Sequence, residues 1–291
     1  MFLPSFAYAV NDLRVLVVLS ENVAPYQSFT AAFQQNLPDN IQARVFDRAE
    51  SFSAENQQAD LIVTVGVKAA EWVMERTATP VLAVMIPSTK YADLLAKHTR
   101  NRLVSAIYID QPLSRQVELL YSALPESKNI GVLYSLDSPI NIKQLHNELA
   151  RHGLNLIAKQ MQNKGAMYSD LEDVLARGDV LLAIPDNTIY SSSNIRNILM
   201  SSYRQRIPLV GLSQAYVNAG ALCSIFSTPE QFAAQASVIA ISFAQTQHLP
   251  DPQPPKLYTI AVNQDVARSL DITIKSPELL HLQVEKAGGV P

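Results

Sequence analysis

The sequence predicts an α/β protein with two similar lobes, each a doubly wound parallel sheet. Apolar runs of strand length alternate with helix-like segments along nearly the whole chain, and such alternation is typical of βαβ units. The runs are almost continuously apolar, as expected of strands that helices cover on both faces. In addition, pairs of similar segments recur in the same order, roughly 115 to 130 residues apart, which favours two copies of one arrangement.

In the first part of the chain, strands are expected over Arg14–Ser20, Gln42–Phe46, Leu61–Val65, Val81–Met85 and Leu103–Ile109. Helices are expected over Pro25–Asn36, Lys68–Arg76 and Ala92–His98. Pro25 suits the first turn of its helix, because that position needs no backbone N–H donor.

In the second part, strands are expected over Asn129–Tyr134, Leu154–Lys159, Val180–Ile184, Pro208–Gly211, Ala221–Phe226 and Leu257–Val262. Helices are expected over Pro112–Leu124, Ile140–Arg151, Ser169–Ala176, Ser191–Arg206, Pro229–Gln247 and Gln264–Ser269. The segment HLPDPQPPK, residues 248–256, is too rich in proline for a helix and predicts a stiff, extended connector. Because a further strand and helix follow it, the lobes are not expected to be simple halves of the chain.

The recurring segments share position and chemistry. Asp60 and Asp179 each precede a buried strand, and Pro80 and Pro208 each open the strand after it. Leu13–Val17 also parallels Asn129–Leu133. The alternative is that all parallel strands look alike; the common order favours a repeat.

Composition excludes several classes of protein. The 291 residues include 48% hydrophobic and 17% charged side chains, enough to bury a full core. The net charge of −3 gives no electrostatic support for a nucleic-acid partner. The single cysteine, Cys223, excludes a disulfide framework and a cysteine-built zinc site. No apolar run approaches the roughly 18 residues of a membrane-spanning helix.

The sequence contains no recognisable catalytic or nucleotide-binding motif. The sequence contains no G-x-G-x-x-G, no G-x-x-x-x-G-K-[ST] and no G-x-S-x-G. Its five histidines are scattered, and Cys223 lies in a strand-like run that favours a buried, inert thiol. We therefore expect no catalytic residue, no metal ligand and no cofactor.

The first residues resemble the end of a secretory signal peptide. Residues 1–9 read MFLPSFAYA, and Ala7-Tyr8-Ala9 is the A-x-A pattern that precedes signal-peptidase cleavage. This predicts the truncated remnant of a signal peptide over residues 1–9, and hence export to the periplasm. The alternative is an ordinary N-terminal arm.

Polar residues follow the expected strands, and in open α/β sheets ligands bind at those carboxyl ends. The candidate ligand-binding residues are Ser20, Glu21, Thr64, Gly66, Ser88 and Thr89 in the first lobe, and Ser135, Asp137, Ser138, Asp186, Asn187, Ser213 and Gln214 in the second. Hydroxyl and amide groups dominate, which suits binding of a small polar molecule better than chemistry on it. The alternative for each is a helix cap or turn. Asp186 has both options, as a cap of the helix near Ser191 or as a ligand contact.

Four segments carry a resemblance to a known family. They read QPLSRQVELLYSALPESKNIGVLYS, DVLLAIPDNTIYSS, IPLVGLSQAYVNAGAL and KLYTIAVNQDVARSLDITI. Together they resemble the ABC-transporter substrate-binding proteins of the tryptophan/tyrosine-binding type. The P-D-N-T element, followed by N-A-G-A-L some thirty residues on, is the most specific part. The position of Asp186 in P-D-N-T matches the family motif, so the resemblance implies a ligand-facing role there.

The resemblance implies a type I periplasmic-binding-protein fold, with Rossmann-like lobes, a hinge of three crossings and a ligand cleft. The crossings would fall near residues 108–112, 226–229 and 252–256, giving one lobe of residues 10–109 and 228–254 and another of 110–227 and 255–291. It also implies a small-molecule ligand, in characterised members often an aromatic amino acid, and an ABC permease in the inner membrane as partner. We expect a monomer.

Two loops depart from the family pattern. A Thr-Asp-Pro-like turn is replaced by Met85-Ile86-Pro87-Ser88, and an Asn-Pro-x-Glu-x-Asn-Ser element by Ser135–Asn141. The predicted function is an exported solute-binding protein that delivers a small polar or amino-acid-like ligand to a permease. The alternatives are a ligand sensor without transport and, less favoured, an enzyme on a doubly wound fold such as a nucleotide-sugar transferase.

Overall fold

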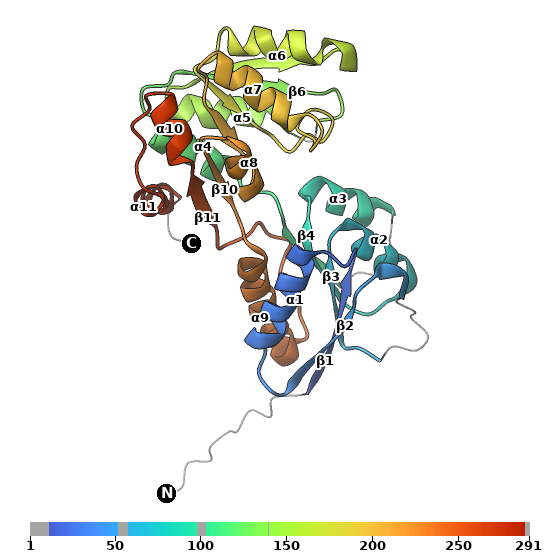
Figure 1. Ribbon diagram of the computed structural model, residues 1–291. Coiled ribbons are helices and arrows are strands. Elements are labelled where there is room, and N and C mark those ends of the chain that lie inside the picture. Colours follow the sequence, from blue (N-terminus) through green and yellow to red (C-terminus); the bar gives the residue numbers. More distant parts are fainter. Residues whose placement is uncertain (1–11, 52–57, 98–102, 139, 289–291) are drawn as a thin grey trace, which may run out of the picture. The chain divides into compact units, whose positions relative to one another are not determined.

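The computed structural model describes residues 12–51, 58–97, 103–138 and 140–288, so the predicted signal-peptide remnant lies outside the described residues. The chain forms two compact units (Figure 1). Unit 1 takes Met1–Asp110 and Ser227–Leu257, and unit 2 takes Gln111–Phe226 and Tyr258–Pro291. The chain therefore passes from one unit to the other three times.

Unit 1 contains a parallel sheet in the strand order β2-β1-β3-β4-β5. Its strands are β1 (Leu13–Leu19), β2 (Ile41–Phe46), β3 (Leu61–Val65), β4 (Val81–Ile86) and β5 (Val104–Tyr108). Its helices are α1 (Ala24–Asn36), α2 (Val67–Arg76), α3 (Ser88–Lys97), α9 (Pro229–Thr246) and the short η1 (Ala49–Ser51).

Helices cover both faces of this sheet. On one face, α1 and α9 pack against each other, and their aromatic side chains, among them Phe33 and Phe232, are fully buried against β1 and β3. On the other face, α2 and α3 contribute Val73 and Tyr91 to a second apolar cluster. Because β3 is buried on both faces, all five of its residues lie inside the unit.

Unit 2 contains a sheet in the order β11-β10-β9-β8-β6-β7, parallel except for β11. Its strands are β6 (Asn129–Tyr134), β7 (Asn155–Gln160), β8 (Val180–Leu182), β9 (Leu209–Gly211), β10 (Cys223–Phe226) and β11 (Thr259–Val262). Its helices are α4 (Leu113–Ala123), α5 (Ile142–Arg151), η3 (Lys164–Ala166), α6 (Met167–Leu175), α7 (Ile195–Arg204), α8 (Gln214–Ala219), α10 (Gln264–Ser269) and α11 (Pro277–Ala287).

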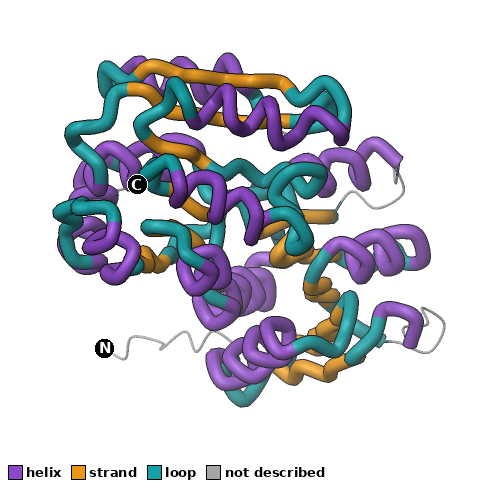
Figure 2. The backbone as a smooth tube through the Cα atoms, turned by 45° about the horizontal axis from the view of Figure 1, so that its top comes forward, coloured by secondary structure: helices purple, strands orange, loops and turns teal. Residues whose placement is uncertain are grey.

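The unit 2 sheet is also covered on both faces (Figure 2). Helices α6 and α8 lie on one face, where a Cβ on Gly131 would come within 2.6 Å of Val174 in α6, and one on Gly211 within 2.5 Å of Tyr216 in α8. Helix α4 contacts both α5 and α11. The predicted α/β class, with doubly wound and mainly parallel sheets, is therefore confirmed.

The predicted repeat has a counterpart in the hydrogen bonds of the two units. Asp60, just before β3, accepts the Arg14 N–H at 2.9 Å. Asp179, just before β8, accepts the N–H groups of Lys128 and Asn129, both at 2.8 Å. Each carboxylate thus joins the start of one strand to the start of its neighbour, β1 to β3 in unit 1 and β6 to β8 in unit 2.

Some predicted boundaries require correction. The third crossing lies after Leu257 rather than after residue 254. The proline-rich connector stays with unit 1 because Gln253 pairs with β5, through bonds to Ala106 and Tyr108, and because the Lys256 N–H donates to Gln235. The other two crossings differ from prediction by one residue each. Helix α7 begins at Ile195 rather than Ser191, since the residues before it form turns.

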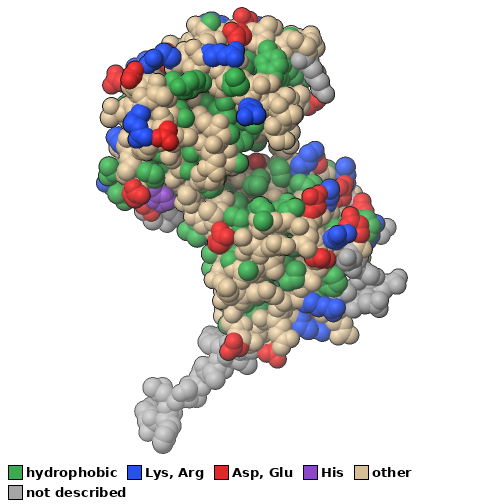
Figure 3. All heavy atoms as spheres, in the orientation of Figure 1, with side chains coloured by type: hydrophobic (Ala, Val, Ile, Leu, Met, Phe, Trp, Pro, Cys, Tyr) green, Lys and Arg blue, Asp and Glu red, His purple; other side chains and the backbone are tan. Residues whose placement is uncertain are grey.

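None of the described helices is long and apolar enough to span a bilayer. On the face drawn in Figure 3, acidic and basic side chains are interspersed over each unit. Charged side chains on that face therefore do not gather into a field of one sign.

Candidate ligand-binding site

In unit 1, Ser20 and Gly66 meet at the carboxyl ends of β1 and β3. The Ala69 N–H of α2 donates to the Ser20 hydroxyl at 2.9 Å, so Ser20 caps a helix that begins 47 residues later in the chain. Gly66 has a φ of 87°, and a Cβ there would lie 2.5 Å from the Tyr26 hydroxyl and 2.7 Å from the Ser20 hydroxyl. Glycine is therefore required for both conformational and steric reasons.

Glu21 also contacts the start of α2. Its carboxylate pairs with the Lys68 ammonium at 2.5 Å, and both side chains are more than half exposed. The hydrogen bond and the charge of Lys68 lower the pKa of Glu21, and those of Glu21 raise the pKa of Lys68. Because water screens an exposed pair, this contact contributes little to stability. It leaves two opposite charges side by side at the rim of the sheet.

The remaining candidates of unit 1 differ in accessibility. Thr64 is fully buried within β3, and its hydroxyl has no hydrogen-bond partner among the described residues. Thr89 is exposed in the first turn of α3. The Ser88 N–H donates to Asp110 at 2.6 Å, so a carboxylate from the loop after β5 caps α3. Just before this contact, Met85 has a φ of 57°, and the pairing of β4 with β5 shifts register.

In unit 2, Asp186 joins two loops. It is 3% exposed, and its carboxylate accepts the Ser135 N–H at 2.7 Å and the Thr188 N–H at 3.0 Å. The first bond reaches the loop after β6 and the second tightens its own loop after β8. Asp186 therefore does not cap α7, which begins at Ile195; it fixes the loop after β6 against the loop after β8.

Ser135 and Ser20 occupy equivalent positions but are used differently. The Asp60 N–H donates to the Arg14 carbonyl, and the Asp179 N–H donates to the Asn129 carbonyl, so Arg14 and Asn129 are equivalent positions. Ser20 and Ser135 each lie six residues after these positions. The Ser20 hydroxyl accepts a helix N–H. The Ser135 hydroxyl is buried and has no partner among the described residues.

Tyr216 fixes a third loop of unit 2. The Tyr216 hydroxyl of α8 donates to the Tyr190 carbonyl at 2.8 Å, which links the loop after β9 to the loop after β8. Gly211 leaves the space that the Tyr216 ring needs. Ser213 precedes α8 without a side-chain cap, and Gln214 bonds only within that helix.

The other candidates of unit 2 lie at the surface. Asp137 and Asn187 are exposed, and Ser138 is half-buried. Within the described chain, Asp137 has no hydrogen bond or ion pair. Leu136, beside it, is 79% exposed at the tip of the same turn. Asp137 and Asn187 thus lie open to solvent.

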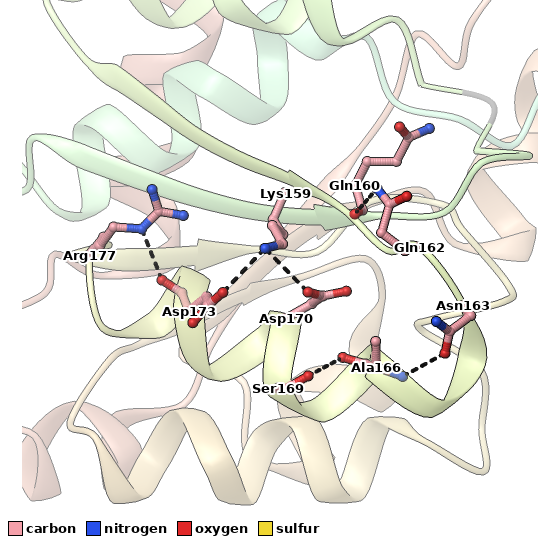
Figure 4. A network of polar contacts seen from close by, with 9 residues as sticks. All are labelled: Lys159, Gln160, Gln162, Asn163, Ala166, Ser169, Asp170, Asp173 and Arg177. Atoms are coloured by element: carbon pink, nitrogen blue, oxygen red, sulfur yellow. Dashed lines mark hydrogen bonds and ion pairs between the residues drawn. The ribbon is translucent and has the colours of Figure 1, made fainter.

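The Lys159 cluster and the buried Cys223 belong to the structure of unit 2 rather than to these loops. Lys159 of β7 bonds to Asp173 at 3.2 Å and Asp170 at 3.3 Å of α6 (Figure 4), and these contacts raise its pKa. Cys223 is fully buried, and burial raises the pKa of its thiol to about 12, which makes it unreactive. The described residues contain no group of three or more side chains suited to a metal ion.

Sequence reasoning missed Asp110, Tyr26 and Tyr216. Asp110 lies 22 residues from the backbone it caps, and Tyr216 lies 26 from its acceptor, so no local motif marks either contact. The role of Tyr26 follows only from the structure, in which its hydroxyl occupies the space beside Gly66. The signal available for Asp110 was its position directly after a predicted strand.

A family profile matches residues 39–285, and its description is ABC transporter substrate binding protein. The chain belongs to this family. The predicted relation to ABC substrate-binding proteins and the type I periplasmic-binding-protein fold are thereby confirmed. Proteins of this family bind substrates and are not enzymes, in line with the predicted absence of catalysis.

Individual proteins and solved structures are also similar to this chain. A Tyrosine-binding protein of Clostridioides difficile is 23% identical over 226 residues, which cover 75% of this chain and 64% of that protein. The chain thus matches less than two thirds of that relative's length. Among solved structures, a substrate binding protein with adhesive properties from Clostridium difficile, ligand-free and open, has a TM-score of 0.72 and 18% identity, with coverages of 91% and 97%. An ABC domain in complex with L-Trp from Streptococcus pneumonia has a TM-score of 0.63 and 18% identity, with coverages of 92% and 98%.

Proposed function

We propose that this protein is an exported solute-binding protein of an ABC import system. It takes up a small, amino-acid-like molecule at the carboxyl ends of its sheet strands and delivers it to a permease in the membrane. Membership of the substrate-binding family supports the binding role, and the names of two relatives, which bind tyrosine and tryptophan, favour an amino acid.

The observation that carries the proposal is the arrangement of Asp186 and Ser135. The Asp186 carboxylate holds the Ser135 backbone, while the Ser135 hydroxyl stays without a partner among the described residues. A buried hydroxyl without a partner costs about 1 to 3 kcal/mol. A ligand that bonds to it recovers that cost, and the negative charge beside it favours an ammonium group.

Unit 1, taken by itself, offers a place that suits a carboxylate group. The start of α2 follows Gly66, and the N–H groups of a helix N-terminus favour an anion. Ser20 takes one of these N–H groups. We assign Glu21, Thr64, Ser88 and Thr89 of unit 1, and Asp137, Ser138, Asn187, Ser213 and Gln214 of unit 2, to the surroundings of the ligand as part of the same proposal.

Delivery requires a change between an open and a closed form. We propose that the chain bends at its three crossings when the ligand binds, as hinged proteins do. The protein would act as a monomer in the periplasm, and the permease would meet the outer rims of both units.

A ligand sensor without transport is the second candidate. The positive φ of Met85 and the register shift beside it lie in the loop that departs from the family pattern. Strained backbone of this kind concentrates at functional sites. A loop that differs from the family pattern at this place favours a different ligand, or a use of ligand binding other than transport. Both candidates bind a small molecule; only the first transports it.

A thermal-shift screen tests the binding role. The purified protein is heated with each proteinogenic amino acid, and with nucleosides, sugars and small organic ions. A ligand at 100 times its Kd stabilises the fold by about 2.7 kcal/mol, which raises Tm visibly. We expect an amino acid to give the largest shift. A shift with sugars alone would contradict the ligand class, and no shift with any compound would contradict the binding role. Uptake of the labelled ligand by cells with and without the gene then separates transport from sensing.

A further inference from the structure

A stack of three side chains lies where the chain enters unit 2. Gln111 is the first residue of unit 2 after the first crossing, and Tyr258 is the first after the third. Arg115 of α4 contacts both of them, and the His281 ring of α11 stacks on the Tyr258 ring. All four residues belong to unit 2, so the stack is internal to one unit.

The geometry of the stack is specific. The Arg115 guanidinium donates to the Gln111 side-chain oxygen at 2.6 Å, and its central carbon lies 4.4 Å from the centre of the Tyr258 ring. The His281 ring lies 4.4 Å from the Tyr258 ring at an interplanar angle of 26°. A cation and an aromatic ring thus both contact the Tyr258 ring, and each kind of contact contributes to stability.

The stack is partly withdrawn from water. Gln111 is 7% exposed, and burial lowers the pKa of the Arg115 guanidinium. Since a desolvated cation–π contact is worth more than an exposed one, Arg115 holds the tyrosine more firmly than a surface arginine would.

We infer that Arg115 is a positioning residue that clamps two of the three crossings to unit 2 as one body. One crossing is held through the side chain of Gln111 and the other through the ring of Tyr258. Asp110 and Lys256 are bonded within unit 1, to Ser88 and Gln235. Bending at these two crossings is thereby confined to the short links between the anchors, at Asp110–Gln111 and Leu257–Tyr258. The inference uses the hinge of the proposed function, but its test needs no ligand, so a failure of amino-acid binding does not decide it.

Spin labels on the two units measure the effect directly. Gln35 of α1 and Asn147 of α5 are exposed, and cysteines introduced there take the labels, while the buried Cys223 does not. In the ligand-free protein, Arg115→Met removes the charge and the donors, and it should broaden the distribution of distances between the labels. Arg115→Lys keeps a cation above the ring and should restore part of the narrow distribution.

Arg76→Met is the matched control. Arg76 lies 3.8 Å from the centre of the Trp72 ring within α2, far along the chain from any crossing. Its loss removes a contact of the same chemistry and should leave the distribution unchanged. Circular dichroism establishes that each variant is folded; if Arg115→Met is not, Tyr258→Leu, which removes the shared ring, carries the same expectation. A distribution that matches the wild type, or equal broadening by Arg76→Met, overturns the inference.

Discussion

The carboxylate of Asp186 accepts the backbone N–H of Ser135 at 2.7 Å, across 51 residues of sequence. The contact joins the loop after β8 to the loop after β6, two neighbouring strands of one sheet. The Tyr216 hydroxyl extends the connection to the loop after β9. Three loops at one edge are therefore fixed to one another before any ligand arrives, which lowers the cost of ordering them on binding.

Replacing Asp186 tests this arrangement. Asp186→Ala removes both acceptors and leaves the Ser135 N–H buried without a partner, so we expect a loss of about 2 to 4 kcal/mol in the free energy of unfolding. Urea unfolding of the ligand-free protein measures it. Asp137→Ala, in the same cluster of loops but exposed, should change stability by less than about 0.5 kcal/mol. Equal effects of the two substitutions would argue against the Asp186 anchor.

The equivalent serines give a paired prediction. Ser20→Ala removes the cap of α2 and should destabilise the protein by about 1 kcal/mol. Ser135→Ala removes a buried hydroxyl that bonds to nothing within the described chain, so ligand-free stability should not fall and should rise by about 1 kcal/mol. Binding of the amino acid that the screen selects should weaken by about 3- to 10-fold, as calorimetry measures. Wild-type affinity in Ser135→Ala would remove Ser135 from the site.

Gly66 should tolerate no side chain. Gly66→Ala combines a positive φ with a Cβ 2.5 Å from the Tyr26 hydroxyl, and we expect a loss of about 2 to 4 kcal/mol. Gly153 also has a positive φ, 67°, but nothing lies within 4 Å of its Cβ position. Gly153→Ala should therefore cost only the conformational term, about 1 to 2 kcal/mol. Similar losses at both positions, in chemical unfolding, would mean that the close approach at Gly66 is relieved cheaply.

The thiol of Cys223 should report on unfolding. Burial raises its pKa to about 12, whereas the unfolded chain ionises near 9.0. The folded state thus favours the protonated form, and the associated stability is complete below pH 9 and is lost progressively as the pH rises toward 12. Between pH 8 and 10.5 the wild type should lose more stability than Cys223→Ala. Parallel losses in the two proteins, or rapid alkylation of the native thiol at pH 8, would contradict this account.

Sequence patterns predicted strands better than helix ends. The strands are continuous apolar runs, such as Leu61–Val65, whose bounds were predicted without error. Helix α11 was missed although Ser276 and Pro277 form a recognisable start. Helix α8, which is separated from the short strand β9 by two residues, was also missed.

The candidate site could be predicted only in part. The carboxyl ends of parallel strands identified the loops, because their place follows from topology alone. The partners within those loops did not follow: Asp186 reaches Ser135, and Asp110 reaches Ser88, through contacts that no spacing encodes. Which serine caps a helix and which keeps its hydroxyl without a partner is decided by three-dimensional packing.

The most direct test of the central claim is hydrogen–deuterium exchange with and without the small molecule that the screen selects. The account predicts slower exchange in the loops at the carboxyl ends of both sheets, around residues 20–22, 64–68 and 86–89 in unit 1 and 135–138, 183–190 and 212–216 in unit 2. Protection confined to other places, such as the shallow hollow lined by Leu199, Tyr203 and Leu270, would contradict it.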